Sequence, residues 1–225
     1  SKYGSRNIFM SFEAMGQSRI LTCRWKDLEL RIRLERQNPD SLVINLPFDE
    51  YAHAFYYNHK INCMTAEGWV RTRKREWRFD PKDSFGILDW GRGVWPFHSE
   101  WYWSNASGYL EGEIFGFNLG CGFGNTETAS ENMLFYKGRA HKLGKVDFIL
   151  GETYMDPWHL CDREGRLDLW LTPVFDRETR IKLLWVDNNC HQMFGSFCGT
   201  AVLDDGSELE VKDIISFAEH AVNNW

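Results

Sequence analysis

The chain has 225 residues, of which 43% are hydrophobic and 16% aromatic, and its formal net charge is −6. So many aromatic residues exclude a disordered chain, and the acidic balance argues against a general nucleic-acid binder, which needs an excess of basic residues. The sequence has no run of 18 or more apolar residues, the length that predicts a membrane-spanning helix.

Cysteine usage points to a reducing compartment. The six cysteines are scattered without CxxC pairs, which is typical of free thiols, so we expect a cytoplasmic protein. We expect no metal site, because no cysteine or histidine pair has standard zinc spacing. We expect no cofactor either, because the glycine-rich segment at 120–125 lacks the spacing of a nucleotide-binding loop. The sequence gives no indication of the oligomeric state.

The first third of the chain is predicted to form antiparallel strands. In residues 27–35, leucine and isoleucine alternate with charged residues, which is the period of a half-buried strand. Strand-like segments precede and follow it at 18–25 and 41–46. The same pattern continues through residues 53–64 and 68–80.

Residues 80–93 interrupt this pattern. Pro81 and closely spaced glycines predict a long irregular segment here. Long ordered loops in compact domains are often functional, so this segment is a candidate site.

The strand pattern then resumes and continues almost to the C-terminus. Asp205–Gly206 predicts a hairpin turn. Only the last 15 residues look helical, because apolar residues recur there at steps of three and four, so we predict one C-terminal helix packed on a sheet. The number of short strands favours an all-β fold of antiparallel barrels. The residues behind the helix prediction are Val211, Ile214, Ile215, Ala218 and Val222.

The segment 113–125 places glycines opposite aromatic residues. Phe115 and Phe117 fall on one strand face, and Gly116 and Gly120 fall on the other. A row of glycines in a strand permits strong curvature or the close approach of another group. Two interpretations stay open: the glycines make room for bulky side chains from a facing sheet, or they leave a cavity for a ligand.

The aromatic-rich stretch 87–103 carries the candidate chemistry. Apolar surroundings would raise the pKa of Asp89 or Glu100 and keep that carboxyl protonated as a general acid, although a salt bridge or loop cap is the structural alternative. A second segment, 53–64, alternates so that Tyr56, Asn58 and Lys60 share one face. The candidate catalytic residues are Asp89 and Glu100, and the candidate ligand-binding residues are Tyr56, Asn58, Trp90, Arg92, Trp95, Trp101, Trp103 and Asn118.

Several long segments, in order, resemble one family. The segments FYYNHKINCM, FGILDWGRGVWPF and WYWSNASG, together with the ending LDDGSELEVKDIISFAEHAVNNW, are similar to the domain of unknown function 2804 family over nearly the whole chain. Members of that family tend to be longer at the N-terminus. The family in turn resembles calycin-like proteins built from two tandem lipocalin-like barrels, among them carotenoid hydratases and fungal Diels-Alderases. This implies a partial first barrel in residues 1–60 and a second barrel with a C-terminal helix in residues 61–225.

The resemblance also implies a type of ligand. In the distant relatives the ligand is apolar and lies within or between barrels, and hydration begins with protonation of an alkene. Our leading hypothesis is a lipocalin-like protein that binds an apolar, isoprenoid- or lipid-like small molecule against the tryptophans. Two alternatives stay open: an acid-catalysed hydratase, isomerase or cyclase, or a structural or interaction module. No catalytic residue is carried over from the family, so Asp89 and Glu100 rest on local chemistry alone.

Overall fold

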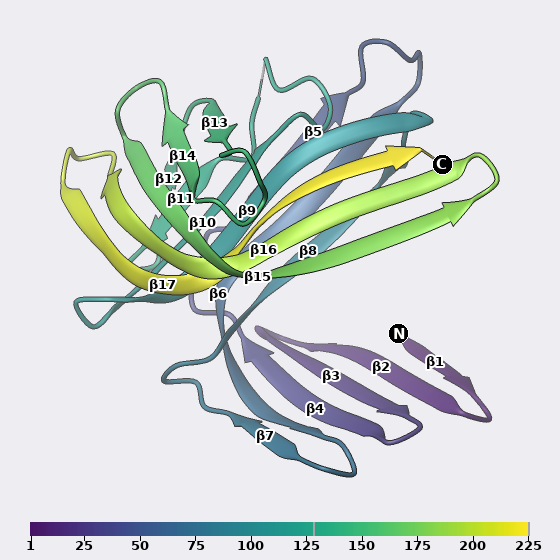
Figure 1. The fold of residues 1–225 in the computed structure, drawn as a ribbon. Coiled ribbons are helices and arrows are strands. Elements are labelled where there is room, and N and C mark those ends of the chain that lie inside the picture. The colour runs from purple at the N-terminus through teal and green to yellow at the C-terminus, as the bar shows by residue number, and fades with distance from the viewer. Residues whose placement is uncertain (128, 225) are drawn as a thin grey trace.

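All regular secondary structure in the computed structural model, which describes residues 1–127 and 129–224, is β-strand. The strands form two antiparallel sheets, one of eight strands and one of nine. In Figure 1 the purple strands β1–β4 lie below, the green and yellow strands β14–β17 curve above them, and β6 runs between the two regions. The prediction of an all-β fold is confirmed.

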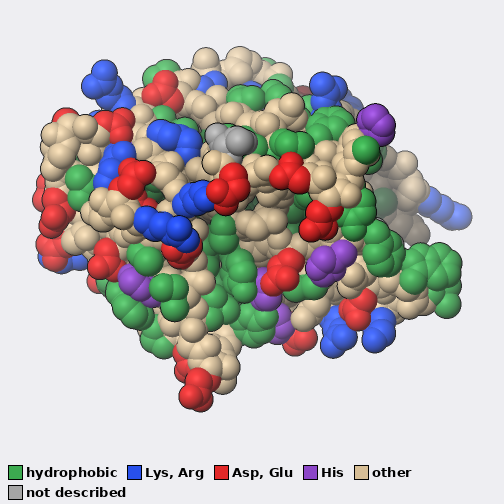
Figure 2. Space-filling model, turned by 90° about the horizontal axis from the view of Figure 1, so that it is seen from above, with side chains coloured by type: hydrophobic (Ala, Val, Ile, Leu, Met, Phe, Trp, Pro, Cys, Tyr) green, Lys and Arg blue, Asp and Glu red, His purple; other side chains and the backbone are tan. Residues whose placement is uncertain are grey.

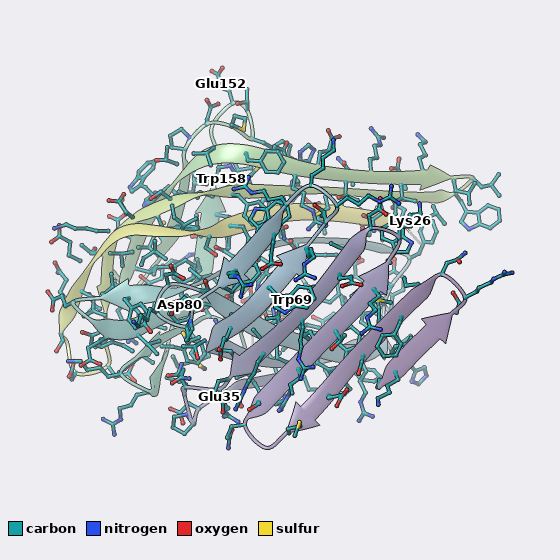
Figure 3. The ribbon with its side chains drawn as sticks, turned by 90° about the horizontal axis from the view of Figure 1, so that it is seen from below. Lys26, Glu35, Trp69, Asp80, Glu152 and Trp158 are labelled. Atoms are coloured by element: carbon teal, nitrogen blue, oxygen red, sulfur yellow. The ribbon has the colours of Figure 1, made fainter. Side chains whose placement is uncertain are left out.

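The first sheet is organised around its longest strand, β6. This strand pairs with β4 and β5 along one edge and with β7 and β8 along the other. The strands are β1 (Lys2–Ser5), β2 (Ile8–Met15), β3 (Ser18–Trp25), β4 (Leu28–Glu35), β5 (Leu42–Pro47), β6 (Phe55–Arg71), β7 (Glu76–Phe79) and β8 (Phe85–Val94). Figure 3 shows this sheet from below, with Lys26 and Glu35 at opposite ends of β4.

The second sheet curves into a half-barrel in the order β12-β11-β10-β9-β17-β16-β15-β14-β13. Its inner face holds the largest core, which includes Phe117, Trp158 and Phe197, all fully buried. Its strands are β9 (His98–Leu110), β10 (Glu113–Cys121), β11 (Met133–Tyr136), β12 (Arg139–Lys142), β13 (Val146–Ile149), β14 (Trp158–Asp162), β15 (Leu167–Leu183), β16 (Val186–Val202) and β17 (Glu208–Asn224).

The surface is polar with local apolar areas. Seen from above, acidic and basic side chains are interspersed, and hydrophobic side chains gather at the right-hand edge, the side to which β15 and β16 extend in Figure 1 (Figure 2). Leu183, Leu184 and Trp185, at the turn between these two strands, are all exposed. Within residues 1–127 and 129–224, no helix has the length and apolar character to cross a membrane.

A bulge in β6 fastens the two sheets to each other. The pairing of β6 with β8 shifts between Ile61 and Met64, and the residues at the bulge reach the second sheet. Asn62 donates from Nδ2 to the backbone oxygen of Phe117 at 3.0 Å, and the amide of Cys63 donates to Ser107 Oγ at 3.2 Å. The centre of β6, a strand of the first sheet, is therefore held against β9 and β10 of the second sheet.

The predicted C-terminal helix is wrong, because the segment forms strand β17. Its pairing with β16 shifts between Phe197 and Gly199, so Val211 and Ile214 both face the core although they are three residues apart. The later step of four, from Ile214 to Ala218, equals two strand periods. A β-bulge followed by ordinary alternation thus reproduced the spacing of a helix.

The predicted irregular segment at 80–93 is also wrong for most of its length. Strand β8 occupies Phe85–Val94 and pairs with β6. The glycines that suggested a loop allow close strand packing instead: a Cβ on Gly93 would lie 2.2 Å from the backbone oxygen of Phe55. Asp89 therefore lies on a strand. The division into domains at residue 60 stays a prediction, and β6 runs through that position.

Candidate active site

A cavity of about 170 Å³ lies where the two sheets face each other. The first sheet contributes residues of β6 and β8, and the second sheet contributes residues of β9, β17 and the connection between β10 and β11. The cavity is lined by Tyr56, Asn58, Lys60, Asp89, Trp101, Trp103, Phe123, Glu131 and Glu219.

Strand alternation and register bring these side chains together. On β6, alternate residues point to one face, which places Lys60 on the side of Tyr56. Across the β6–β8 pair, Lys60 lies opposite Asp89, and across the β9–β17 pair, Trp103 lies opposite Glu219. Residues more than 100 positions apart in the chain thus face one space.

Lys60 is a buried cation held by two carboxylates. It is 3% exposed, and its Nζ lies 2.7 Å from Glu131 Oε2 and 3.6 Å from Asp89 Oδ2. The ammonium also lies 4.2 Å from the ring centroid of Trp103, in a cation–π contact. A buried charge needs such partners, because its desolvation costs several kcal/mol. The three charged groups sum to one negative charge when both carboxylates are ionised.

Asn118 positions two of the cavity residues. Its Nδ2 donates to the backbone oxygen of Glu131 at 2.8 Å, and its Oδ1 accepts from Trp103 Nε1 at 2.8 Å. A Cβ on the neighbouring Gly120 would lie 2.6 Å from Glu131 Oε1. Gly120 therefore provides the space for the Glu131 carboxylate.

Glu219 is the carboxyl group best placed to act as an acid. It is 8% exposed, and its two oxygens accept from neutral donors: Trp101 Nε1 at 3.0 Å and Gln192 Nε2 at 2.9 Å. Burial raises the pKa of Glu219 above its ordinary value, and the negative charge of Asp89 adds to this effect. The two hydrogen bonds and Lys60 oppose it without reversing it. A carboxyl with a raised pKa keeps its proton to a higher pH than an ordinary glutamate, which favours a role as a general acid.

Aromatic side chains and one amide complete the lining. Phe123 packs 4.8 Å from Tyr56 and 5.0 Å from Trp101, measured between ring centroids. Burial raises the pKa of Tyr56, and Glu131 and Asp89 raise it further, so its hydroxyl stays protonated. Asn58 Oδ1 is buried without a hydrogen-bond partner among the described residues.

Five of the residues predicted from the sequence meet in this cavity. They come from three strands, and Asp89 is the candidate acid among them. Its carboxylate faces Lys60 and is about one-third exposed, which differs from the apolar setting expected from the sequence. The five are Tyr56, Asn58, Asp89, Trp101 and Trp103.

The other predicted residues lie elsewhere. Trp90 and Trp95 are exposed, and Arg92 stacks over Tyr57 at 5.8 Å. Glu100 is on the opposite face of β9 from Trp101, and its Oε1 lies 2.8 Å from His220 Nε2. Asn118 is fully buried behind the cavity wall.

Sequence reasoning missed Glu219 and left the roles of Lys60 and Glu131 undefined. Alternation did place Lys60 on the face of Tyr56, but nothing local showed its carboxylate partners. Glu219 was assigned to a helix, and only its pairing with Trp103 on β9 reveals where it points. Across residues 1–127 and 129–224, no three histidine, cysteine or acidic side chains are grouped so that they could hold a metal ion.

The fold is similar to that of a solved structure. The crystal structure of kievitone hydratase from Nectria haematococca matches with a TM-score of 0.62 and 11% sequence identity, over 99% of this chain and 69% of that chain. At this identity the similarity shows a shared fold. A search of curated proteins found no significant match. The sequence model described as domain of unknown function (DUF2804) matches residues 1–225, and the chain belongs to this family.

Proposed function

We propose that this protein is an enzyme that protonates a carbon–carbon double bond of an apolar small molecule, with Glu219 as the general acid. The observation that carries the proposal is the buried Glu219 carboxyl, whose pKa is raised and which lines a cavity with two tryptophans. Protonation of a double bond can be the first step of a hydration, an isomerisation or a cyclisation. Among these we favour hydration, and the fold shared with a hydratase supports that choice by analogy.

The proposed hydration uses two carboxyl groups. The O–H of neutral Glu219 gives its proton to one alkene carbon, which leaves a Glu219 carboxylate and a carbocation at the other carbon. A water molecule adds to the carbocation, and its surplus proton passes to the Asp89 carboxylate. Exchange with solvent then returns Asp89 and Glu219 to their starting states. Asp89 is suited to the second step because it lines the cavity and is partly exposed.

The walls of the cavity suit the intermediate. Indole rings attract a cation to their faces. The cluster of Lys60, Asp89 and Glu131 carries a net negative charge when both carboxylates are ionised, which also favours a cation. A cavity of about 170 Å³ accommodates the reacting end of a ligand, and the rest of the molecule would extend out of it. An isoprenoid-like chain has this elongated, apolar and unsaturated character.

Deuterium incorporation tests the proposal. The protein is incubated in deuterium oxide with geraniol or farnesol, two isoprenoid alcohols with trisubstituted double bonds, and products are analysed by mass spectrometry. We expect a product with a new carbon-bound deuterium for the wild type and a strongly reduced rate of its formation for Glu219→Gln. Equal incorporation by both proteins would refute the role of Glu219.

Binding without turnover is the second candidate function. The aromatic side chains of Tyr56, Trp101 and Trp103 favour it, because apolar ligands are commonly held by such walls. Mass spectrometry of the purified protein would then find a bound apolar molecule that is released unchanged. In that case Glu219→Gln would alter neither the ligand nor its retention.

A further inference from the structure

On the face of the second sheet that carries Glu219, three polar side chains form a row across β15, β16 and β17. Arg177 on β15 lies opposite Gln192 on β16, and Gln192 lies opposite Glu219 on β17. Side chains directly opposite each other on antiparallel strands are close together on one face. Arg177 is exposed and Glu219 is buried, so Gln192 connects a surface residue to the proposed acid.

Hydrogen bonds at both ends of the row fix the direction of the Gln192 amide. Arg177 Nη1 donates to Gln192 Oε1 at 3.2 Å, and Gln192 Nε2 donates to Glu219 Oε2 at 2.9 Å. A guanidinium has donors and no acceptor, so it can pair with the oxygen of the amide and not with its NH₂ group. Arg177 therefore favours the orientation in which the NH₂ group of Gln192 faces Glu219.

The direction of this amide decides where the proton of a neutral Glu219 can go. In the observed orientation both neighbours of the carboxyl, Trp101 and Gln192, present N–H groups, which cannot accept a proton. The O–H of Glu219 is then left for a molecule in the cavity that Glu219 lines. A reversed Gln192 would instead present Oε1, and a carboxylic acid readily donates its O–H to an amide oxygen. That hydrogen bond would withhold the proton from a substrate.

We propose that Arg177 is a positioning residue, which acts through Gln192 to keep the proton of Glu219 available to the substrate. The guanidinium holds the amide oxygen of Gln192, and the amide N–H in turn holds Glu219 Oε2. Neither Arg177 nor Gln192 gives up the transferred proton. The inference rests on the proposed function and adds two residues to the control of its acid.

Titration of Glu219 by NMR in two variants of Arg177 tests the connection. Arg177→Met removes the donors and keeps a long side chain, so Gln192 is free to turn its oxygen toward a neutral Glu219. Glu219 should then bind its proton about threefold to tenfold more tightly than in the wild type, the effect of one hydrogen bond. Arg177→Lys keeps a cationic donor and should titrate closer to the wild type. Unchanged titration of Glu219 in Arg177→Met would overturn the proposal.

A double-mutant cycle separates this effect from the loss of a positive charge. Gln192→Leu removes the connecting amide, so adding Arg177→Met to it should not change the titration of Glu219 further. An equal effect of Arg177→Met with and without Gln192 would overturn the proposal, because Arg177 would then act by its charge alone. Arg180→Met is the control on the same strand, because Arg180 pairs with Asp187 on the other face, and it should leave the titration unchanged. Arg177 is exposed, so its two variants decide the question by themselves if Gln192→Leu does not fold.

The pH profile of deuterium incorporation tests the consequence for the reaction. At low pH Glu219 is fully protonated, so a change in its proton affinity alone would leave the limiting rate there unchanged. A proton redirected to Gln192 should instead lower that limiting rate in Arg177→Met by about threefold to tenfold, and Arg177→Lys should restore most of it. A limiting rate in Arg177→Met equal to that of the wild type would overturn the positioning role.

The outcome is separable from that of the proposed function. The NMR titration requires no substrate, so a coupling of Arg177 to Glu219 through Gln192 without deuterium incorporation by the wild type would retain the hydrogen-bonded row and reject the enzyme. Incorporation that depends on Glu219 but not on Arg177 would retain the enzyme and reject the role of Arg177.

Discussion

The two faces of the β9–β17 pair carry acidic residues with different surroundings. On the face toward the first sheet, Glu219 is buried and accepts from the neutral N–H groups of Trp101 and Gln192. On the other face, the side chain of Glu100 is 49% exposed and contacts His220, whose Nδ1 lies 2.7 Å from the Tyr154 hydroxyl. Of the two carboxyl groups only that of Glu219 is buried, and the charge of Lys60 does not offset the effect of this burial on its pKa.

Glu219 and Glu100 differ in solvent exposure and in hydrogen-bond partners, and these two properties determine whether a glutamate can act as an acid. Desolvation penalises the charged form, so Glu219 has a raised pKa, as the proposed role of proton donor requires. Glu100 can share a charge-assisted hydrogen bond with His220 when the imidazole is protonated. Chemistry on this sheet is therefore expected on one face, and variants of the two glutamates test that expectation.

The largest expected effect is on turnover. Glu219→Gln removes the proposed acid and should lower the rate of deuterium incorporation by a factor on the order of 10²–10⁴. Glu100→Gln is its counterpart on the other face and should keep nearly the wild-type rate. A large loss in Glu100→Gln together with an active Glu219→Gln would contradict this assignment and favour Glu100, one of the two candidate acids predicted from the sequence.

The next effect concerns stability. Lys60→Met leaves the Glu131 carboxylate buried without its cation, which should lower the free energy of unfolding by about 3 kcal/mol. Adding Glu131→Gln to this variant should recover part of the loss. Arg33→Met removes the exposed pair with Glu35 and should cost less than about 1 kcal/mol. Urea unfolding measures all three, and equal losses for Lys60→Met and Arg33→Met would contradict the account of the buried ion group.

A smaller effect is expected at Gly120. The new methyl of Gly120→Ala would press against the Glu131 carboxylate, and overpacking of this kind costs about 2 kcal/mol. Gly4→Ala is the control, because its Cβ would have no neighbour closer than 3.8 Å. Thermal unfolding of the two variants should differ accordingly, and an unaffected Gly120→Ala would show that Glu131 moves freely.

The smallest effect is a change of stability with pH. The folded pKa of Glu219 is above its ordinary value of 4.5, so the folded state binds the proton more tightly than the unfolded state. The stability that Glu219 contributes is complete below pH 4.5 and is lost as the pH rises through the folded pKa. The free energy of unfolding of the wild type should therefore fall relative to Glu219→Gln over this range. A difference that grows with pH would have the wrong sign.

The sequence predicted the parts of the fold that depend on local alternation. Residues 27–35 and the face shared by Tyr56, Asn58 and Lys60 follow from the period of two, and the structure has them so. The bulge near Gly199 was not visible, because a single shift of register turns a strand pattern into helical spacing. The glycines of 80–93 had the same ambiguity, since they permit either a loop or a closely packed strand.

The site could be predicted only in part for a related reason. Trp101 and Trp103 were found because they are aromatic and close in sequence, but Trp90 and Trp95 share those features and lie at the surface. The sequence shows which residues cluster along the chain, and the strand faces decide which of them meet. The pairing of Lys60 with Glu131, and of Glu219 with Trp101, depends on contacts across the two sheets.

The measurement closest to the central claim is the pKa of Glu219 itself. Side-chain carboxyl signals can be followed by NMR as a function of pH, and the signal missing from Glu219→Gln identifies the residue. The account predicts that this carboxyl titrates above its ordinary value of 4.5 and holds its proton where other glutamates are ionised. Titration at or below that value would contradict the account, because Glu219 would then have no proton to donate.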